Sequence, residues 1–325
     1  MNPREGAQST EPASSERAFV TARFDAPWKA GLQRFFRAFL AFCFPNVHAI
    51  IDWEVAPKFL DKELQPLAPT HAQGQCVVDV LVEVKWLEGD AGWLMVHVEL
   101  QAQPDRDFPL RMWVYHYRIW DRYQRPLVSL AVLADADPKW RPSRYRTEIA
   151  GCVQAFEFPI FKVLDCEDPA GAFERTGNPF ALLVAAHQVA LRTKQDLAAR
   201  VEERFGVVKY LYRRGLAREE VVELFRLIAW LTFLPRDFEL QFQEKLATFE
   251  HTESVMTADT LLAPIEIIAL ERGREEGSLI GRIQYSQDLL KLERSKTEEL
   301  AQRPTAELER QLSDLEARLR DRLRL

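Results

Sequence analysis

Residues 76–86 read CVVDVLVEVKW, residues 88–92 read EGDAG, and residues 93–101 read WLMVHVELQ. Apolar side chains, most of them β-branched, occupy every second position in the two longer runs, which is the two-residue period of a β-strand. The Gly- and Asp-containing cluster between the runs is typical of a turn. The stretch therefore predicts a β-hairpin, and this hairpin decides the fold class.

Further elements are predicted on both sides of this hairpin. Apolar residues three or four positions apart predict helices over 28–44, 57–64, 110–123, 179–205, 209–214, 218–234 and 238–249. Short apolar runs predict strands over 126–134 and 158–164, separated by a Pro- and Arg-rich loop that extends to about residue 147. We expect Pro45 to end the first helix. This order predicts an α/β or α+β core followed by an all-helical region.

The chain of 325 residues is long enough for more than one domain. Its composition divides it into four expected parts: a disordered tail over 1–25, an α/β domain over 26–170, a helical domain over 178–275 and a charged helical segment over 276–325. Within the last part, leucines repeat at the spacing of a short coiled-coil seam, at Leu308, Leu312, Leu315 and Leu319. The seam predicts a homo-oligomer formed through the C-terminal helix.

Overall charge and cysteine usage exclude several classes of protein. The chain has 43 Lys and Arg against 49 Asp and Glu, a formal net charge of −6, which excludes a wholly basic, histone-like binder. The four cysteines form no C-x-x-C pair, so neither a zinc ribbon nor a secreted disulfide framework is indicated, and we expect a cytoplasmic protein. Because no apolar run reaches the roughly 18–20 residues of a membrane span, we expect no membrane partner.

Two acidic residues of the hairpin are predicted to meet. A turn centred near residue 90 places Asp79 opposite Glu99 or Gln101. Directly opposed side chains in a sheet have Cβ atoms roughly 4.5–5.5 Å apart, and two carboxylates at that distance repel each other. A divalent cation relieves the repulsion, and Mg²⁺ binds one or two carboxylates together with water and phosphate oxygens. Asp79 and Glu99 are therefore candidate metal ligands for phosphodiester hydrolysis.

The same spacing also fits a hairpin with one solvated face, on which the two carboxylates share no role. Large apolar residues such as Trp93 and Met95 lie on the face of Asp79 and Glu99, and this mixture favours the floor of a cleft over open surface. His97 lies on that face as well, and we expect it to be packed rather than catalytic.

The predicted helix over 110–123 carries two stripes of side chains. Trp113, Tyr117 and Trp120 recur at helical spacing, and we assign them to the core. The second stripe consists of Arg111, Tyr115, Arg118 and Arg122. Arginines beside an acidic metal site suit the binding of DNA phosphates, so this second stripe is a candidate DNA contact. The alternative is a solvated helix face with Asp121 and Glu148 as ion-pair partners.

The residues discussed so far resemble a known family. Asp79, a turn and then Glu99-Leu100-Gln101, followed by a helix, resembles the core of the PD-(D/E)XK nucleases, and the chain is more closely similar to the recombination-promoting nuclease and putative transposase family. The similarity covers roughly residues 25–275 and includes FLDKELQ at 59–65, VHVELQ at 96–101, VYHYR at 114–118, SLAVL at 129–133, WRP at 140–142, GNPFA at 177–181 and ERGREEG at 271–277.

The resemblance implies a Mg²⁺-dependent DNA endonuclease with a restriction-endonuclease-like αβββαβ core over 26–170, linked to recombination or transposable elements. Asp79 and Glu99 would bind Mg²⁺ or another divalent cation, and Glu63 would match a glutamate that assists the metal. Gln101 would stand where the wider superfamily has a lysine that positions the water. Because Gln101 is neutral, the alternative is a catalytically degenerate nuclease fold that acts as a DNA-binding or assembly module.

Overall fold

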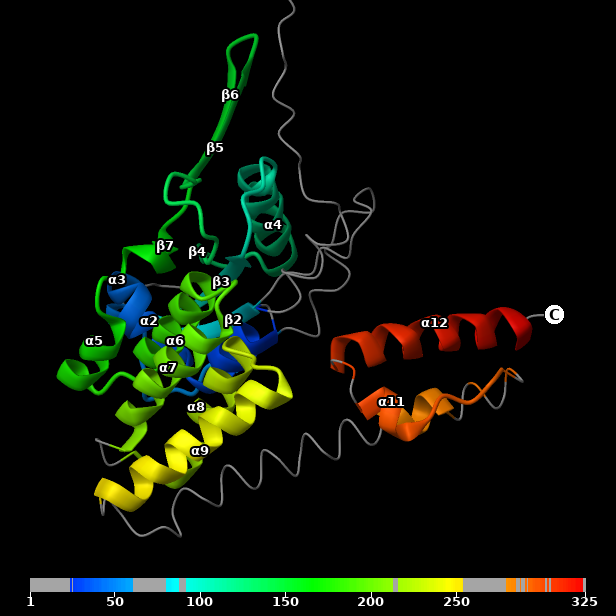
Figure 1. Cartoon of the computed structure of the whole chain (residues 1–325). Helices are drawn as coiled ribbons and strands as arrows, with labels where there is room; N and C mark the ends of the chain where they lie inside the picture. Colours follow the sequence, from blue (N-terminus) through cyan, green and yellow to red (C-terminus); the bar gives the residue numbers. More distant parts are fainter. Residues whose placement is uncertain are drawn as a thin grey trace, which may run out of the picture. The chain divides into compact units, whose positions relative to one another are not determined.

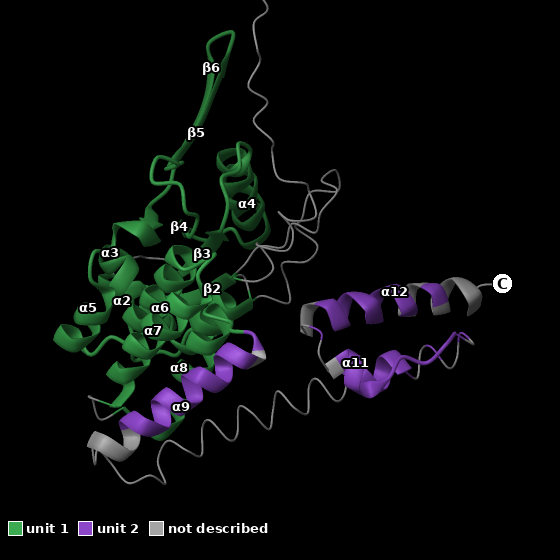
Figure 2. Ribbon diagram, viewed as in Figure 1, with its two compact units in different colours: residues 1–234 green, residues 235–325 purple. Residues whose placement is uncertain are grey.

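The computed structural model describes residues 24, 26–60, 80–87, 92–212, 216–253, 279–284, 287, 290, 292–301, 303 and 305–323. These residues fall into two compact units, one that ends at Leu234 and one that begins at Pro235, shown in different colours in Figure 2. Of the expected tail over 1–25, only Phe24 is described, and its ring packs against the ring of His187 with 4.6 Å between centroids.

The first unit is built on a mixed five-stranded sheet, which confirms the predicted combination of helices and strands. Its strand order is β1-β2-β3-β4-β7, and Figure 1 labels β2, β3, β4 and β7. The bounds are β1 Lys58–Phe59, β2 Val80–Lys85, β3 Trp93–Gln101, β4 Leu127–Leu133 and β7 Ile160–Lys162. Strands β1, β2 and β3 are mutually antiparallel, whereas β4 runs parallel to β3 and β7 parallel to β4. The predicted strands over 126–134 and 158–164 are thus confirmed as β4 and β7.

The hairpin of β2 and β3 has the register that the sequence predicts. Val80 pairs with Val98, and Lys85 pairs with Trp93 at the other end of the ladder. One face of the sheet is covered by helix α4 (Phe108–Tyr123), which connects β3 to β4. Tyr115 and Ile119 of this helix are fully buried in a cluster with Leu81 of β2 and Met95 of β3. The crossover helix therefore lies directly on the odd-numbered side chains of the central strands.

The opposite face of the sheet is covered by helices from two distant parts of the sequence. Helix α2 (Phe36–Cys43) reaches both edges, because Phe36 contacts Phe59 of β1 and Phe42 contacts Phe161 of β7, with ring centroids 5.6 and 6.1 Å apart. Helix α6 (Phe180–Arg192) is buried at every position from Phe180 to Ala190. A helix that is buried on every side lies in the interior, so α6 is the centre of the helical layer.

A histidine fixes α6 to the end of the sheet. The Trp28 indole Nε1–H donates to Nδ1 of His187 (3.1 Å), so Nε2 of His187 carries the ring hydrogen and donates to the carbonyl of Ala134 (2.8 Å). Burial lowers the pKa of His187 to about 4, which keeps the ring neutral and preserves this arrangement. The three residues link the first helical stretch, α6 and the end of β4.

Helices around α6 complete the first unit. They are α3 (Pro45–Ala49), α5 (Pro169–Thr176), α7 (Leu197–Val208) and α8 (Arg218–Leu231), with 3₁₀ turns η3 (Val163–Asp165) and η4 (Lys209–Tyr212). We expected a domain boundary between residues 170 and 178, but hydrogen bonds join the two sides. Asn178 donates to the carbonyl of Ala38 (2.8 Å), and Gln188 donates to the carbonyls of Val163 and Cys166. The expected α/β and helical domains are therefore parts of one compact unit that ends at Leu234.

Three local expectations differ from the structure. Pro45 does end one helix, but it also occupies the first turn of the next, α3, where its missing N–H costs nothing. The predicted helix over 57–64 begins instead as strand β1, and its remainder from 61 on lies outside the described residues. The predicted single helix over 179–205 is two helices, because residues 193–196 leave the helix and Asp196 caps α7 by accepting from the N–H of Ala199.

A second hairpin was not predicted. Strands β5 (Arg144–Ile149) and β6 (Cys152–Glu157) pair antiparallel and project from the rest of the unit, next to α4 (Figure 1). The turn residues Ala150 and Gly151 both have positive φ, 51° and 83°, as a two-residue hairpin turn requires. We expected a loop up to about residue 147, because every second residue of β5 from Arg144 to Glu148 is charged and the run is not strongly apolar. We call this hairpin the arm.

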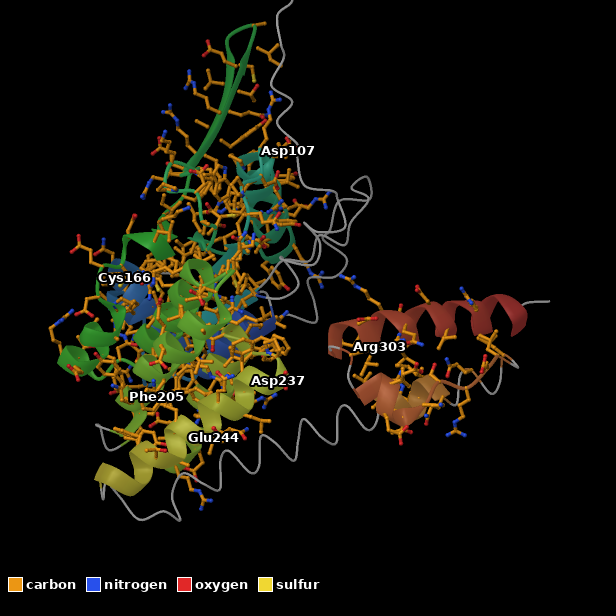
Figure 3. The ribbon with its side chains drawn as sticks, viewed as in Figure 1. Asp107, Cys166, Phe205, Asp237, Glu244 and Arg303 are labelled. Atoms are coloured by element: carbon orange, nitrogen blue, oxygen red, sulfur yellow. The ribbon has the colours of Figure 1, made fainter. Side chains whose placement is uncertain are left out.

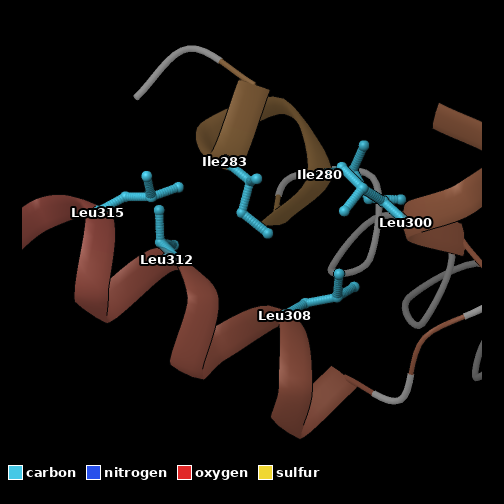
Figure 4. Close-up of a cluster of buried hydrophobic side chains, with 6 residues drawn as sticks. All are labelled: Ile280, Ile283, Leu300, Leu308, Leu312 and Leu315. Carbon is cyan, nitrogen blue, oxygen red and sulfur yellow. The ribbon is translucent and has the colours of Figure 1, made fainter. Parts of the chain in front are cut away.

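The second unit is helical. It contains α9 (Arg236–Glu253), a helical turn over 279–284, α11 (Thr297–Ala301) and α12 (Thr305–Leu323). The leucines of the predicted coiled-coil seam lie on α12, where Leu308, Leu312 and Leu315 pack against Ile280, Ile283 and Leu300 of the same unit (Figure 4). These leucines are therefore used within one chain, and the predicted oligomer through this seam gains no support from their packing. Within the described part of the chain, no helix is both long and apolar enough to cross a membrane.

The buried neutral His187 predicts an acid-sensitive fold. Its pKa is about 4 in the folded chain and near 6.5 when unfolded, so the unfolded state binds more protons between these values. The contribution of neutral His187 to the free energy of unfolding is therefore complete above pH 6.5. As the pH falls toward 4, the free energy of unfolding decreases by up to about 3 kcal/mol. Urea unfolding of the wild type and of His187→Gln at pH 7 and pH 5 measures the difference. The variant should lose less stability on acidification, and equal losses would contradict the prediction.

Candidate functional site

Two of the predicted site residues lie at the end of the central strand. Glu99 and Gln101 project from β3 on the face that α4 covers, next to Ala131 and Leu133 of β4 in the register. Glu99 is buried, with 3% of its surface exposed, and Gln101 is half-buried. Strand β3 is paired with β2 from Trp93 to Val98 and with β4 from Met95 to Gln101. The polar side chains of Glu99 and Gln101 at its end need hydrogen-bond partners, which come from β3 itself, the residues that follow it and α4.

A chain of hydrogen bonds runs to Glu99 beneath α4. As a carboxylate, Glu99 can only accept, so Nε2 of His97 donates to its Oε1 (3.2 Å). Nδ1 of His97 then accepts from the hydroxyl of Ser129 on β4 (3.0 Å), whose oxygen in turn accepts from Nδ1 of His116 on α4 (3.0 Å). Each group in the chain thus donates to the next with one consistent set of tautomers.

Both histidines of this chain are neutral. Burial lowers the pKa of His97 to about 3, and burial together with the nearby His97 lowers the pKa of His116 to about 4. The network therefore supplies a neutral donor, and not a second positive charge, to the carboxylate of Glu99. His97 itself is fully buried, which agrees with our expectation that it is packed.

Arg111 of α4 is the cation at this site. Its Nη2 donates to Oε1 of Gln101 (2.5 Å), its Nη1 donates to Oδ2 of Asp105 (2.6 Å), and its Nε lies 4.0 Å from Oε2 of Glu99. Its guanidinium also lies over the ring of Phe108, 5.1 Å from the centroid. The amide of Gln101 is held at its other end by donation to the carbonyl of Gln103 (2.7 Å). Glu99, Gln101 and Arg111 thus form one fixed group, which we call the Glu99 cluster.

The remaining predicted site residues are placed differently. Asp79 and Glu63 lie outside the described residues. Tyr115 was expected to contact DNA, but it is fully buried and its ring packs edge-on against His97, so it belongs to the core. Arg118 is half-buried and Arg122 is exposed, with its guanidinium over the ring of Tyr123. These two arginines remain on the surface of the helix.

The two stripes of α4 are therefore assigned differently from the expectation. The buried side chains are Phe108, Met112, Tyr115 and Ile119, whereas the predicted core residues Tyr117 and Trp120 are 50% and 47% exposed. Both stripes repeat at the same helical spacing, so periodicity alone could not choose between them. In the folded chain, the side of α4 that carries Met112 and Ile119 packs against the sheet.

The oxygen ligands of the predicted metal site suit a hard cation, but only some of these ligands belong to residues that the structure describes. Glu99 supplies carboxylate oxygens and Gln101 an amide oxygen at one end of β3, and such oxygens are the ligands that Mg²⁺ prefers. Among the residues that the structure describes, no group of three His, Cys, Asp or Glu could hold a metal ion. A complete site would therefore need a ligand from outside them, and Asp79 is the predicted one.

Sequence reasoning missed Ser129, His116 and Asp105 as parts of the site. His97 and Glu99 share a strand face two residues apart, which is a usable signal, but Ser129 joins them only through the parallel pairing of β3 with β4. Comparison of the chain with family models, with curated proteins and with solved structures found no match. The site is therefore interpreted from its own geometry.

Ser129→Ala should destabilise the protein by about 2 kcal/mol, because it removes the buried partner of both histidines. Ser143→Ala is the matched control, since the side chain of Ser143 is exposed and its loss should cost less than about 0.5 kcal/mol. Urea unfolding at pH 7 measures both. If the two variants are equally stable, the hydrogen-bond chain does not hold the strands and α4 together.

Proposed function

We propose that this chain is a Mg²⁺-dependent DNA endonuclease of the recombination-promoting nuclease type. The observation that carries the proposal is the topology. Two helices, α2 and α3, are followed by three antiparallel strands, the crossover helix α4 and strand β4, which is parallel to β3. This element order is compatible with the αβββαβ core that the sequence resemblance implies and so supports the proposal.

The register supports the choice of ligands. The last described pair of the hairpin is Val80 with Val98, and their neighbours in the sequence are Asp79 and Glu99. We therefore propose that these two carboxylates hold the metal, as the hairpin geometry predicts. When bound, Mg²⁺ polarises the phosphodiester and lowers the pKa of the attacking water.

The other residues of the Glu99 cluster supply orientation and charge. His97 donates to one oxygen of Glu99 and so fixes the direction of the carboxylate. Gln101 is neutral, and the guanidinium of Arg111 donates to its amide oxygen, so a positive charge lies beside the side chain at position 101. We propose that Arg111 compensates for the missing lysine by stabilising negative charge on the phosphate.

The alternative function is a nuclease fold that binds DNA without cleaving it. Two observations favour it: Glu99 is 3% exposed, and its carboxylate is already matched by His97 and Arg111. This alternative predicts DNA binding that falls steeply with salt and no cleavage with any divalent cation.

Purified protein should nick supercoiled plasmid with Mg²⁺ and not with EDTA. Glu99→Gln should abolish nicking, because the amide keeps the hydrogen bond from His97 and removes the charge that binds the metal. Glu157→Gln, at an exposed position of the arm, is the matched control and should nick like the wild type. Nicking by Glu99→Gln at the wild-type rate would refute the site, and binding without nicking by the wild type would favour the alternative.

Substitutions of Arg111 test the compensating charge. Arg111→Gln should reduce nicking at least about tenfold, whereas Arg111→Lys should keep part of the activity, because lysine retains the charge and loses the two-pronged contact with Gln101 and Asp105. Thermal unfolding shows whether each variant is folded. Equal activity of the Lys and Gln variants would show that charge at this position has no part in the reaction.

A further inference from the structure

The arm is a two-stranded sheet that is separate from the main sheet. Among the residues that the structure describes, β5 and β6 pair only with each other, so each strand has one open edge. In Figure 3 the arm, with its side chains, extends past the start of α4, which the label Asp107 marks. An isolated hairpin is marginally stable in water, and its open edges are templates for further strands. The arm therefore presents a surface on which another strand can pair.

Contacts with α4 hold the base of the arm. The ring of Tyr145 stacks on the ring of Trp113, with centroids 6.4 Å apart and planes 11° from parallel, and the ring of Phe156 lies 4.5 Å from the ring of His116. Next to the turn, in contrast, Ile149 is 73% exposed. The contacts with α4 thus fix the direction of the arm and leave an apolar side chain near its tip in solvent.

The hydrogen-bond pattern of the arm shows which residues of β5 face the open edge. In an antiparallel ladder, every second residue of a strand bonds its partner strand, and the residues between them turn their backbone groups the other way. The N–H of Phe158 donates to the carbonyl of Ser143 (2.9 Å), which continues the ladder of β5 and β6 by one pair. The odd-numbered residues of β5 therefore bond β6, and the backbone groups of Arg146 and Glu148 point to the open edge.

The open edge of β5 is complementary to itself. The arm, Arg144–Glu157, carries two arginines and two glutamates, so its lack of net charge suits a copy of itself better than a polyanion. Arg146 and Glu148 lie on one face of β5, and their side chains are paired, 2.8 Å apart and 54% exposed. Such an exposed pair contributes little by itself. When two copies of β5 pair antiparallel about Thr147, Arg146 of each copy lies opposite Glu148 of the other.

Neighbouring registers fit less well. Pairing about Arg146 or about Glu148 places like charges directly opposite each other, which destabilises a sheet. Pairing about a point between two residues sets the open-edge residues against residues that already bond β6, so the ladder cannot form. Pairing about Thr147 also brings Ile149 of each copy opposite Tyr145 of the other, and this aromatic and β-branched pair covers the exposed side chain near the tip.

We propose that the chain forms a two-fold symmetric dimer in which the β5 strands of two copies pair antiparallel about Thr147. The two arms, each of two strands, then form one continuous sheet with Thr147 at the two-fold axis. Because each copy uses the same edge, the contact closes at two copies. The arm, and not the leucine seam of α12, is then the surface that joins the copies. The inference does not depend on the proposed nuclease function.

Charge reversal tests the contact, with the mass of the full chain measured by light scattering over a range of concentrations. The wild type should have twice the mass of the 37.6 kDa chain. Arg146→Glu and Glu148→Arg should each weaken the dimer at least about tenfold, because each substitution sets like charges opposite each other at both symmetry-related positions. The variant with both substitutions should regain the dimer.

Mixing the two single variants separates pairing between chains from the ion pair within one arm. Each single variant supplies the charges that the other lacks, so the mixture should contain a dimer of one chain of each kind. The ion pair within an arm stays broken in both variants and cannot produce this result.

Proline substitutions test the hydrogen-bonding edge. Arg146→Pro removes an N–H from the open edge of β5 and should abolish the dimer. Ala155→Pro is the matched control, because Ala155 is the partner of Arg146 in the arm and its N–H points to the open edge of β6. This control should remain a dimer, and thermal unfolding shows whether both variants are folded.

Three results would overturn the proposal. A wild type that is a monomer at every concentration leaves the open edge to a strand of another protein. A dimer that persists in Arg146→Pro is formed through another surface. Single variants that do not combine on mixing rule out the register about Thr147.

Discussion

The structure depends on the burial of strand β3 on both faces and on its pairing with β2 and β4, which is two-sided from Met95 to Val98. Val96 and Val98 face the helical layer around α6, and His97 and Glu99 face α4, all with almost no exposure. A polar group in such a strand must be satisfied by the protein, because an unpaired buried polar group costs about 1–3 kcal/mol. Ser129 and Glu99 are the hydrogen-bond partners of the His97 ring, and His116 is the second partner of Ser129. Arg111 adds a positive charge 4.0 Å from Glu99.

The same constraint shapes what the site can do. A hydrogen bond from His97 holds Glu99, and hydrogen bonds with Arg111 and Gln103 hold Gln101, which is the pre-organised state that catalysis needs. It also places the guanidinium of Arg111 4.0 Å from the carboxylate of Glu99, an arrangement that a binding protein without catalysis could equally keep. The two proposed functions thus differ in a single physical respect, namely whether a divalent cation with its water can share the carboxylate with Arg111.

The sequence predicted the hairpin of β2 and β3, strands β4 and β7 and helix α4, because these elements are long or strongly periodic. It did not predict the arm, because β5 alternates the charged residues Arg144, Arg146 and Glu148 with Tyr145, Thr147 and Ile149, and this pattern is less apolar than that of β2 and β3. It also assigned Tyr115 to the surface and Tyr117 to the core, because both stripes of α4 repeat with the same period and only the sheet decides between them. Among the site residues, Glu99 and Gln101 were correctly placed on one face, because residues two positions apart in a strand point the same way. Ser129 could not be foreseen, because its contact with His97 depends on a parallel register between strands separated by a helix.

The most direct test of the account is a titration of the protein with Mn²⁺, a paramagnetic substitute for Mg²⁺, followed by electron paramagnetic resonance. The account predicts one tightly bound ion per chain in the wild type and its loss in Asp79→Asn and in Glu99→Gln, with both variants still folded. Equal Mn²⁺ binding in all three proteins, or none in the wild type, would contradict the claim that these two carboxylates form a metal site.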